Sequence, residues 1–70
     1  ELYNEFIMTR LRTNTGIPLD KLTTKDRQYC LNIAKHYIEQ KLLSIKNNHL
    51  HLTTEGIFIS NDIISDMMKS

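Results

Sequence analysis

The stretch LSIKNNHLHL, residues 43 to 52, alternates apolar and polar side chains with a period of two. This period is typical of a strand with one buried face, whereas the segments on either side repeat at the helical spacing of three and four. We expect Asn47 and Asn48 to form a tight turn, because asparagine tolerates the positive φ of a type I′ turn. The sequence therefore predicts a two-stranded β-hairpin, with Leu43 opposite Leu52 and Ile45 opposite Leu50 on the inner face, and Ser44, Lys46, His49 and His51 on the outer face.

The first segment, residues 2 to 13, is predicted to be a helix that ends near Asn14. Gly16 is expected to take the left-handed conformation of a Schellman stop, with the following isoleucine folding back onto the helix. Arg10 falls inside the apolar arc of the helical wheel, whereas Met8 and Arg12 lie on the other side. The helix is therefore expected to be apolar nearly all round, with one side for its own core and another for a partner. The apolar positions of this segment are Leu2, Tyr3, Phe6, Ile7 and Leu11.

A short helical turn at residues 18 to 22 is predicted to precede the longest helix, which runs from Thr23 to Leu42. Thr23 stands three residues before Asp26, so its hydroxyl should accept an amide hydrogen bond while the carboxylate returns to the cap. The positions predicted to be buried are Tyr29, Cys30, Ile33, Ala34, Tyr37 and Ile38. The opposite, polar face carries Gln28, Asn32, Lys35, His36 and Glu39.

The last segment is predicted to be one helix capped by Thr53, with Glu55 in the first turn, where it is favourable against the helix dipole. Gly56 inside this helix costs on the order of 1 kcal/mol relative to alanine. We therefore expect close backbone packing of Gly56 near the hairpin. The main apolar stripe is predicted to be Ile57, Ile64 and Met68, with Ile63 and Met67 beside it.

These elements predict an α+β, mainly helical fold: a winged-helix-like domain of three to four helices with one two-stranded β-hairpin. Residues 1 to 70 are expected to form one domain, because a chain this short has no room for a second core or a deep enzyme cleft. The formal net charge of +1, with its signs interleaved, argues against nucleic acid or an anionic membrane as a partner. One cysteine and no long apolar run favour a cytoplasmic protein without a membrane span.

The two hairpin histidines, His49 and His51, lie on one strand face about 7 Å apart by strand rise. They are close enough to share a metal ion or to serve a haem. No Asp, Glu or Cys stands near them at ligand spacing, so a solvated hairpin face is the simpler interpretation. Cys30 shares its helix face with Ala34, where we expect a packed core thiol and not a nucleophile. We predict no catalytic residue and no metal ligand in this chain.

DNA binding is the alternative function that a winged-helix shape raises, because the outward face of the second long helix would be the recognition surface. On that face Lys35 is offset by Glu39. The face therefore lacks the cationic character that phosphate contacts need, and DNA binding ranks second.

Two segments carry family-like motifs. NEFIMTRLRTNTGI, residues 4 to 17, contains the pattern E-[FY]-x-M-x-x-LR-x-x-x-G-[IV], and LHLTTEGIFISNDII, residues 50 to 64, contains LT-x-x-G-x-x-x-x-N. The matching residues are Glu5, Phe6, Met8, Leu11, Arg12, Gly16 and Ile17, then Leu52, Thr53, Gly56 and Asn61. In this combination the chain resembles the C-terminal domain of the oxygen-independent coproporphyrinogen III oxidase-like family, in particular its haem chaperone branch. It departs from that family between Leu22 and Asp26, where an aromatic residue followed by glycine is expected.

The resemblance implies a parent protein in which a radical S-adenosylmethionine barrel precedes this segment and holds a [4Fe-4S] cluster and S-adenosylmethionine. Family members oxidatively decarboxylate coproporphyrinogen III or, in the chaperone branch, bind haem and pass it on. The appended domain would pack against the barrel and help to cover its open face, with no catalysis and no cofactor of its own. Porphyrin or haem is a further partner under this interpretation. The start at Glu1, without an initiator methionine, agrees with a piece of a larger protein.

Several charged and polar residues have specific expectations. Arg12 should pair with local carbonyl groups or with an acid such as Glu55, and Asn61 should be hydrogen-bonded if it is buried. Arg10 has two interpretations: its stem covers apolar surface while the guanidinium reaches water, or it meets an acidic group across a docking surface or a porphyrin propionate. The motif residues expected to be structural are Leu11, Arg12, Gly16, Thr53, Gly56 and Asn61. The candidate ligand contacts are His49, His51 and Arg10.

Overall fold

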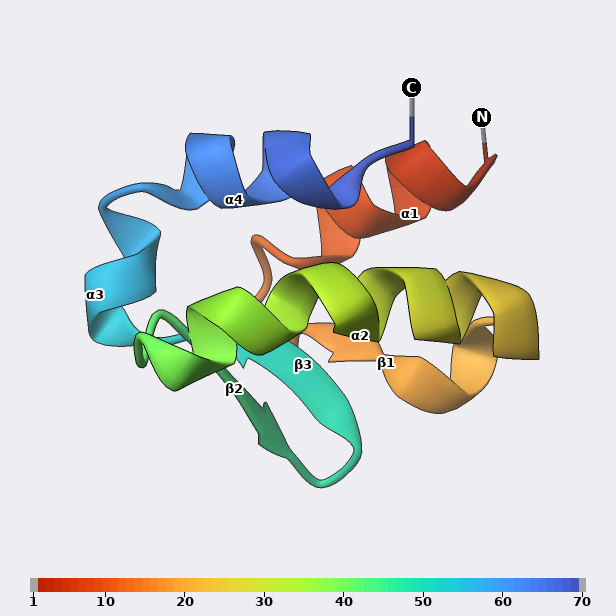
Figure 1. Cartoon of the computed structure of the whole chain (residues 1–70), viewed down its shortest axis with the longest axis horizontal. Coiled ribbons are helices and arrows are strands. Elements are labelled where there is room, and N and C mark those ends of the chain that lie inside the picture. The colour runs from red at the N-terminus through yellow and green to blue at the C-terminus, as the bar shows by residue number, and fades with distance from the viewer. Residues whose placement is uncertain (1, 70) are drawn as a thin grey trace.

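The structure is a computed structural model that describes residues 2–69. Its elements are α1 (Leu2–Arg10), β1 (Ile17–Pro18), the 3₁₀ turn η1 (Leu19–Lys21), α2 (Thr24–Glu39), β2 (Leu43–Lys46), β3 (His49–Leu52), α3 (Thr54–Ile57) and α4 (Ser60–Met67). Figure 1 labels the α-helices and the strands. The expected α+β class with a mainly helical chain is confirmed. The likeness to a winged helix stays a prediction.

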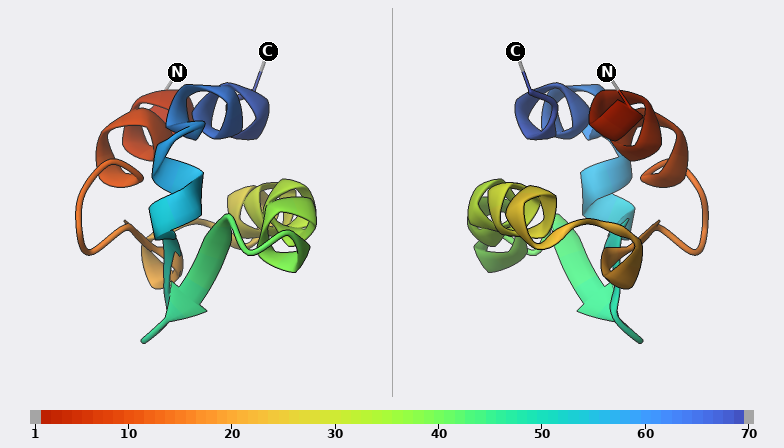
Figure 2. Two further views of the ribbon diagram at one scale, coloured as in Figure 1. Left: turned by 90° about the vertical axis from the view of Figure 1, so that its left-hand side faces the viewer. Right: turned by 90° about the vertical axis from the view of Figure 1, so that its right-hand side faces the viewer.

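Helices α1 and α4 lie side by side on one side of the molecule, and the sheet lies on the opposite side (Figures 1 and 2). Two hydrogen bonds show that the pair is antiparallel. The Tyr3 hydroxyl donates to the Met67 carbonyl at 2.9 Å, and beyond the other end of α1 the Arg12 guanidinium donates to Asn61 Oδ1 at 2.9 Å. Helix α3 connects β3 to α4, and α2 packs against both α4 and β2.

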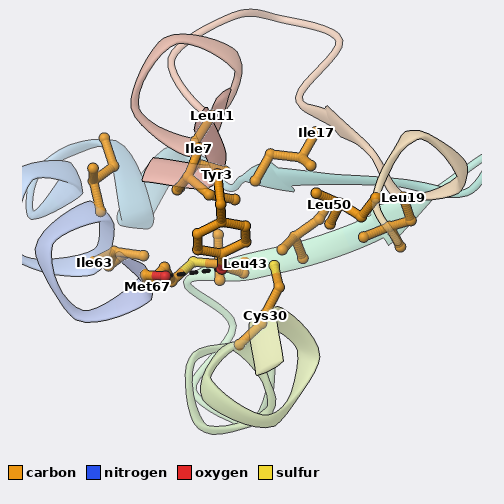
Figure 3. Packing of buried hydrophobic residues seen from close by; sticks show 13 residues of the cluster. Tyr3, Ile7, Leu11, Ile17, Leu19, Cys30, Leu43, Leu50, Ile63 and Met67 are labelled. Atoms are coloured by element: carbon orange, nitrogen blue, oxygen red, sulfur yellow. Dashed lines mark hydrogen bonds between the residues drawn. The ribbon is translucent and has the colours of Figure 1, made fainter. Parts of the chain in front are cut away.

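The core is one cluster of buried apolar side chains contributed by α1, the sheet, η1, α2 and α4 (Figure 3). Cys30 and Ala34 are fully buried, as predicted for the apolar face of α2. Tyr29 was expected in the core but is 36% exposed, because it lies toward the edge of that face. The cluster consists of Tyr3, Ile7, Leu11, Ile17, Leu19, Leu22, Cys30, Ala34, Leu43, Leu50, Ile63, Ile64 and Met67.

The predicted hairpin register is confirmed at both apolar pairs, Leu43 with Leu52 and Ile45 with Leu50. The two turn residues, Asn47 and Asn48, have φ of 53° and 61°, as a type I′ turn requires. The sheet has a third strand that the period-two pattern did not predict, and its order is β1-β3-β2. Strand β1 is only two residues long, and its proline is tolerated because the strand lies at the sheet edge.

The prediction for the end of α1 was wrong, because the helix stops at Arg10 and not near Asn14. Thr13 closes a turn there: its backbone N–H donates to the Arg10 carbonyl at 3.1 Å, and its hydroxyl donates to the same carbonyl at 2.7 Å. Gly16 does adopt a positive φ of 77°, but it lies in the loop before β1 and is not the helix stop. The helical wheel places Arg10 inside the apolar arc of α1, but in the structure Arg10 is exposed.

Helix α2 begins as predicted, with Thr23 Oγ1 accepting a hydrogen bond from the Asp26 amide at 3.1 Å. It ends at Glu39, three residues before the predicted end. Lys41, with φ of 65°, takes the left-handed position, and the amides of Lys41 and Leu42 donate to the carbonyls of Ile38 and Tyr37. These are the two hydrogen bonds of a Schellman motif, formed here without glycine.

The last predicted helix is broken into α3 and α4, because the amides of Phe58 and Ile59 donate to carbonyls only three residues back and close a turn. Ile57 is therefore 60% exposed and does not belong to the buried stripe. The expected close packing of Gly56 is confirmed. A Cβ atom placed on Gly56 would lie 2.0 Å from the Leu42 carbonyl oxygen, so the backbones of α3 and of the α2–β2 link touch.

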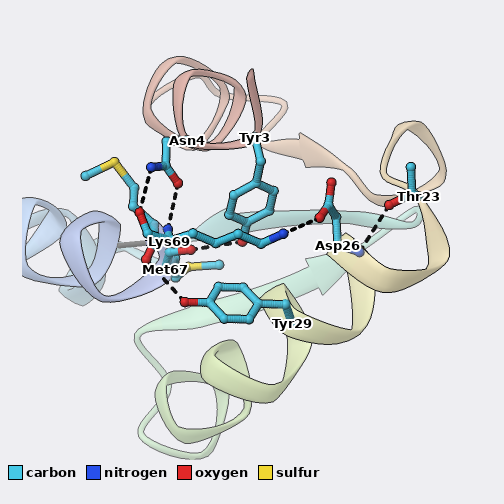
Figure 4. Close-up of polar contacts among 8 residues, drawn as sticks. Tyr3, Asn4, Thr23, Asp26, Tyr29, Met67 and Lys69 are labelled. Carbon is cyan, nitrogen blue, oxygen red and sulfur yellow. Dashed lines mark hydrogen bonds and ion pairs between the residues drawn. The ribbon is translucent and has the colours of Figure 1, made fainter. Parts of the chain in front are cut away.

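Polar contacts hold the end of the chain (Figure 4). The Asn4 side chain makes two hydrogen bonds with the backbone of Lys69, one donated at 2.8 Å and one accepted at 2.6 Å. The Lys69 ammonium group lies 2.5 Å from an Asp26 carboxylate oxygen and 4.8 and 5.3 Å from the ring centroids of Tyr3 and Tyr29. Within residues 2–69, the Asp26 carboxylate thus pairs with Lys69 and does not return to the cap of α2.

Candidate functional site

The predicted hairpin histidines line a polar hollow of about 320 Å³ on the outer side of the sheet. We call it the hairpin hollow. Its lining consists of Asn14, Thr15, Lys46, Asn47, His49 and His51. His49 and His51 are half-buried, and the other four residues are exposed. The structure therefore brings together the two histidines of the prediction, and it adds residues from a loop that the sequence did not place beside them.

Two backbone features build the hairpin hollow. Register pairs Lys46 with His49 across the two strands, so their side chains share the outer face of the hairpin with that of His51. Gly16 lets the loop after α1 approach closely, since a Cβ atom there would lie 2.3 Å from the Leu50 carbonyl oxygen and 2.6 Å from the Cβ of His51. The loop therefore lies directly against β3 and supplies one wall of the hollow.

The His49 ring has one defined partner. Its Nδ1 lies 2.8 Å from the Asn47 carbonyl oxygen, which accepts hydrogen bonds only. Nδ1 must therefore carry the proton, and in the neutral ring Nε2 keeps its lone pair. The turn thus sets both the tautomer and the orientation of this imidazole.

The remaining polar candidates lie elsewhere. The Arg10 guanidinium carbon lies 5.5 Å from the ring centroid of Phe6 in a cation–π contact, and Arg10 is exposed. Arg12 was predicted to pair with local carbonyls or Glu55. It bonds Asn61 instead, because the antiparallel packing of α1 and α4 brings together two side chains that are 49 residues apart in sequence. Asn61 is exposed. The polar face of α2 is also exposed, as predicted: Gln28, Asn32, Lys35, His36 and Glu39.

A second feature, which the sequence analysis missed, is a run of exposed apolar side chains between α3 and α4. Ile57, Phe58 and Ile59 are 60%, 84% and 39% exposed. We call these three residues the apolar edge. Isolated exposed apolar residues are ordinary, but three in succession are not expected unless they serve an interaction. The run of three apolar residues from Ile57 to Ile59 could have indicated this surface in the sequence. It was missed because Ile57 was assigned to the buried stripe of the last helix.

A family model described as the HemN C-terminal domain matches residues 1–59. The chain belongs to this family. The match spans α1 to α3 and contains the motif residues from Glu5 to Gly56. No significant match was found among curated proteins or among solved structures.

As a HemN C-terminal domain, the chain is an accessory domain of HemN-like proteins, which are radical S-adenosylmethionine proteins of the coproporphyrinogen oxidase-like family. In the described part of the chain, no helix has the length and apolar character needed to cross a membrane.

The [4Fe-4S] cluster and S-adenosylmethionine are typical of HemN-like proteins, but the residues of this domain do not fit the cluster. A cubane cluster is held by several cysteine thiolates, and the sequence has only Cys30. This thiol is fully buried, and burial raises its pKa to about 11, so it stays protonated at neutral pH. Among residues 2–69, no three or more His, Cys, Asp or Glu side chains gather at one place. This domain therefore supplies no ligand set for the cluster.

Proposed function

We propose that this HemN C-terminal domain docks through its apolar edge onto the radical S-adenosylmethionine barrel of its parent protein and helps to cover the open face of that barrel. The observation that carries the proposal is the apolar edge itself. Family membership supports the choice of partner, because the HemN C-terminal domain occurs together with such a barrel in HemN-like proteins.

The apolar edge is held in place before any partner arrives. On the α3 side, Thr53 Oγ1 accepts a hydrogen bond from the Gly56 amide at 3.1 Å and donates one to the Lys41 carbonyl at 2.7 Å. On the α4 side, the hydrogen bond between Arg12 and Asn61 ties the start of α4 to the loop after α1. An ordered edge loses little conformational entropy on docking. More of the free energy gained by burying it therefore contributes to affinity.

Phe58 gives the sharpest test of docking. Complete burial of a phenylalanine side chain stabilises a complex by about 1.5–3 kcal/mol, which is roughly ten- to a hundredfold in Kd. We expect Phe58→Ser to weaken, by at least about tenfold, the binding of this domain to the separately produced barrel of its parent protein, measured by isothermal titration calorimetry. Because Phe58 is 84% exposed, the free energy of unfolding of the same variant should lie within about 0.5 kcal/mol of the wild-type value.

Ile45→Ser is the matched control. Ile45 is also a large exposed apolar residue, at 47%, but it belongs to strand β2 and not to the α3–α4 link. Docking through the apolar edge predicts that Ile45→Ser binds the barrel as wild type does. Equal affinities for Phe58→Ser and wild type would show that the edge is not the docking surface.

A further inference from the structure

The lining of the hairpin hollow is all neutral or basic. Its charged and titratable groups are the ammonium of Lys46 and the imidazoles of His49 and His51, and its remaining side chains are two asparagines and a threonine. No carboxylate lines it. Every one of these side chains offers a hydrogen-bond donor when the imidazoles are protonated. The hollow is therefore chemically complementary to a negatively charged oxygen group.

Most of these donors are uncommitted. Within residues 2–69, no hydrogen bond or ion pair engages the side chains of Asn14, Lys46, Asn47 or His51. Thr15 contacts only the Thr13 hydroxyl, at 3.3 Å. Ligand binding to these groups breaks no strong protein contact, so it competes only with water.

The spacing of the basic groups suits one small anion. Side chains of residues directly opposite in an antiparallel pair, such as Lys46 and His49, start about 5 Å apart at Cβ, and two residues along a strand span roughly 7 Å. Like charges directly opposite destabilise a hairpin, whereas an oxyanion between them removes this repulsion.

His49 is already oriented for this role. Its Nδ1–H is committed to the Asn47 carbonyl, which leaves Nε2 as the atom that gains a proton. The protonated ring then keeps its turn contact and offers Nε2–H as a charge-assisted donor within the hollow.

We propose that the hairpin hollow is a binding site for a small oxyanion, either a carboxylate or a phosphate group, held by Lys46, His49 and His51 against the wall formed by Asn14 and Thr15. The proposal does not depend on docking to the barrel, because the hollow and the apolar edge are formed by different residues.

The test is an amide NMR titration of the wild-type chain with inorganic phosphate and, separately, with succinate, at constant ionic strength. The site predicts saturable shifts confined to residues 14–15 and 46–51, which are the hollow's lining and the hairpin turn. Saturation by phosphate alone identifies a phosphate site, and saturation by succinate alone identifies a carboxylate site. Shifts that stay linear for both anions, as chloride would cause, overturn the proposal.

Three variants make the test specific. Lys46→Gln removes an ammonium group and His51→Gln removes an imidazole, and each should weaken binding severalfold while the remainder of the amide spectrum stays native. His36→Gln removes an imidazole from the exposed face of α2 and is the control, which should bind as wild type does. Wild-type affinity in both hollow variants would also refute the assignment.

Discussion

Helix propensity and packing predict opposite effects of Gly56→Ala on the free energy of unfolding. Helix propensity alone predicts a gain of about 1 kcal/mol, because alanine is the best helix former and glycine is among the worst. The structure predicts a loss. The new methyl carbon would lie 2.0 Å from the Leu42 carbonyl oxygen, which is far too close for two non-bonded atoms. It would also lie 3.3 Å from Cδ2 of Leu52, which is a tight contact.

The Leu42 carbonyl cannot move away without further cost, because it accepts the Thr53 amide at 3.0 Å at the cap of α3. Overpacking of a tight contact costs about 1–3 kcal/mol, and a weakened hydrogen bond adds about 0.5–1.5 kcal/mol. After the propensity gain, the net expectation is a loss of about 2 kcal/mol. For a domain of this size this corresponds to a melting temperature lower by roughly 10 °C.

Urea and thermal unfolding followed by far-ultraviolet circular dichroism measure this difference. Asn32→Ala, on the exposed face of α2, is the control, since it gains propensity without new contact and should stabilise by about 0.5 kcal/mol. If Gly56→Ala is as stable as Asn32→Ala, the close approach of α3 to Leu42 is not what glycine provides.

Three further outcomes are expected. Lys69→Met, which loses the ion pair with Asp26 and the cation contacts with two tyrosine rings, should lower the free energy of unfolding in urea by about 1–2 kcal/mol. Lys41→Gly should raise it by about 0.5–1 kcal/mol, because the left-handed C′ position of α2 suits glycine. The Cys30 thiol should resist iodoacetamide in the native state at pH 8. Because folding raises the pKa of Cys30 from 9.0 to about 11, the protonated thiol's contribution to the free energy of unfolding should be complete below pH 9 and lost as the pH rises to about 11. Unfolding midpoints across that range, compared with those of Cys30→Ala, measure this loss.

The hairpin and both threonine caps were predictable because their determinants lie within a few residues of one another. Asn47 and Asn48 supply the turn conformation, and the period-two pattern then leaves one register in which apolar residues pair with apolar residues, although Ile45 is 47% exposed. The hydroxyls of Thr23 and Thr53 similarly find amides three residues ahead.

Most of the features that the sequence analysis missed depend on contacts between distant segments. Strand β1 exists because Ile17 pairs with Leu50, and two residues carry no periodicity of their own. The Schellman stop at Lys41 lacks the glycine that signals one. Only one part of the hairpin hollow could be predicted, because His49 and His51 share a strand. The loop that supplies the other wall lies beside them because β1 pairs with β3, and no local sequence pattern indicates that pairing.

The motif residues of the resemblance act as joints between elements in this structure. Arg12 reaches Asn61 to fasten α1 to α4, Gly16 admits a loop against β3, and Gly56 admits α3 against the end of α2. None of these three contacts presents a reactive group to solvent. The motif therefore specifies how the HemN C-terminal domain is assembled. Under the two proposals made above, its interactions depend on residues outside the joints, namely Phe58 on the apolar edge and Lys46 in the hollow, where we expect substitution to change binding without unfolding the chain.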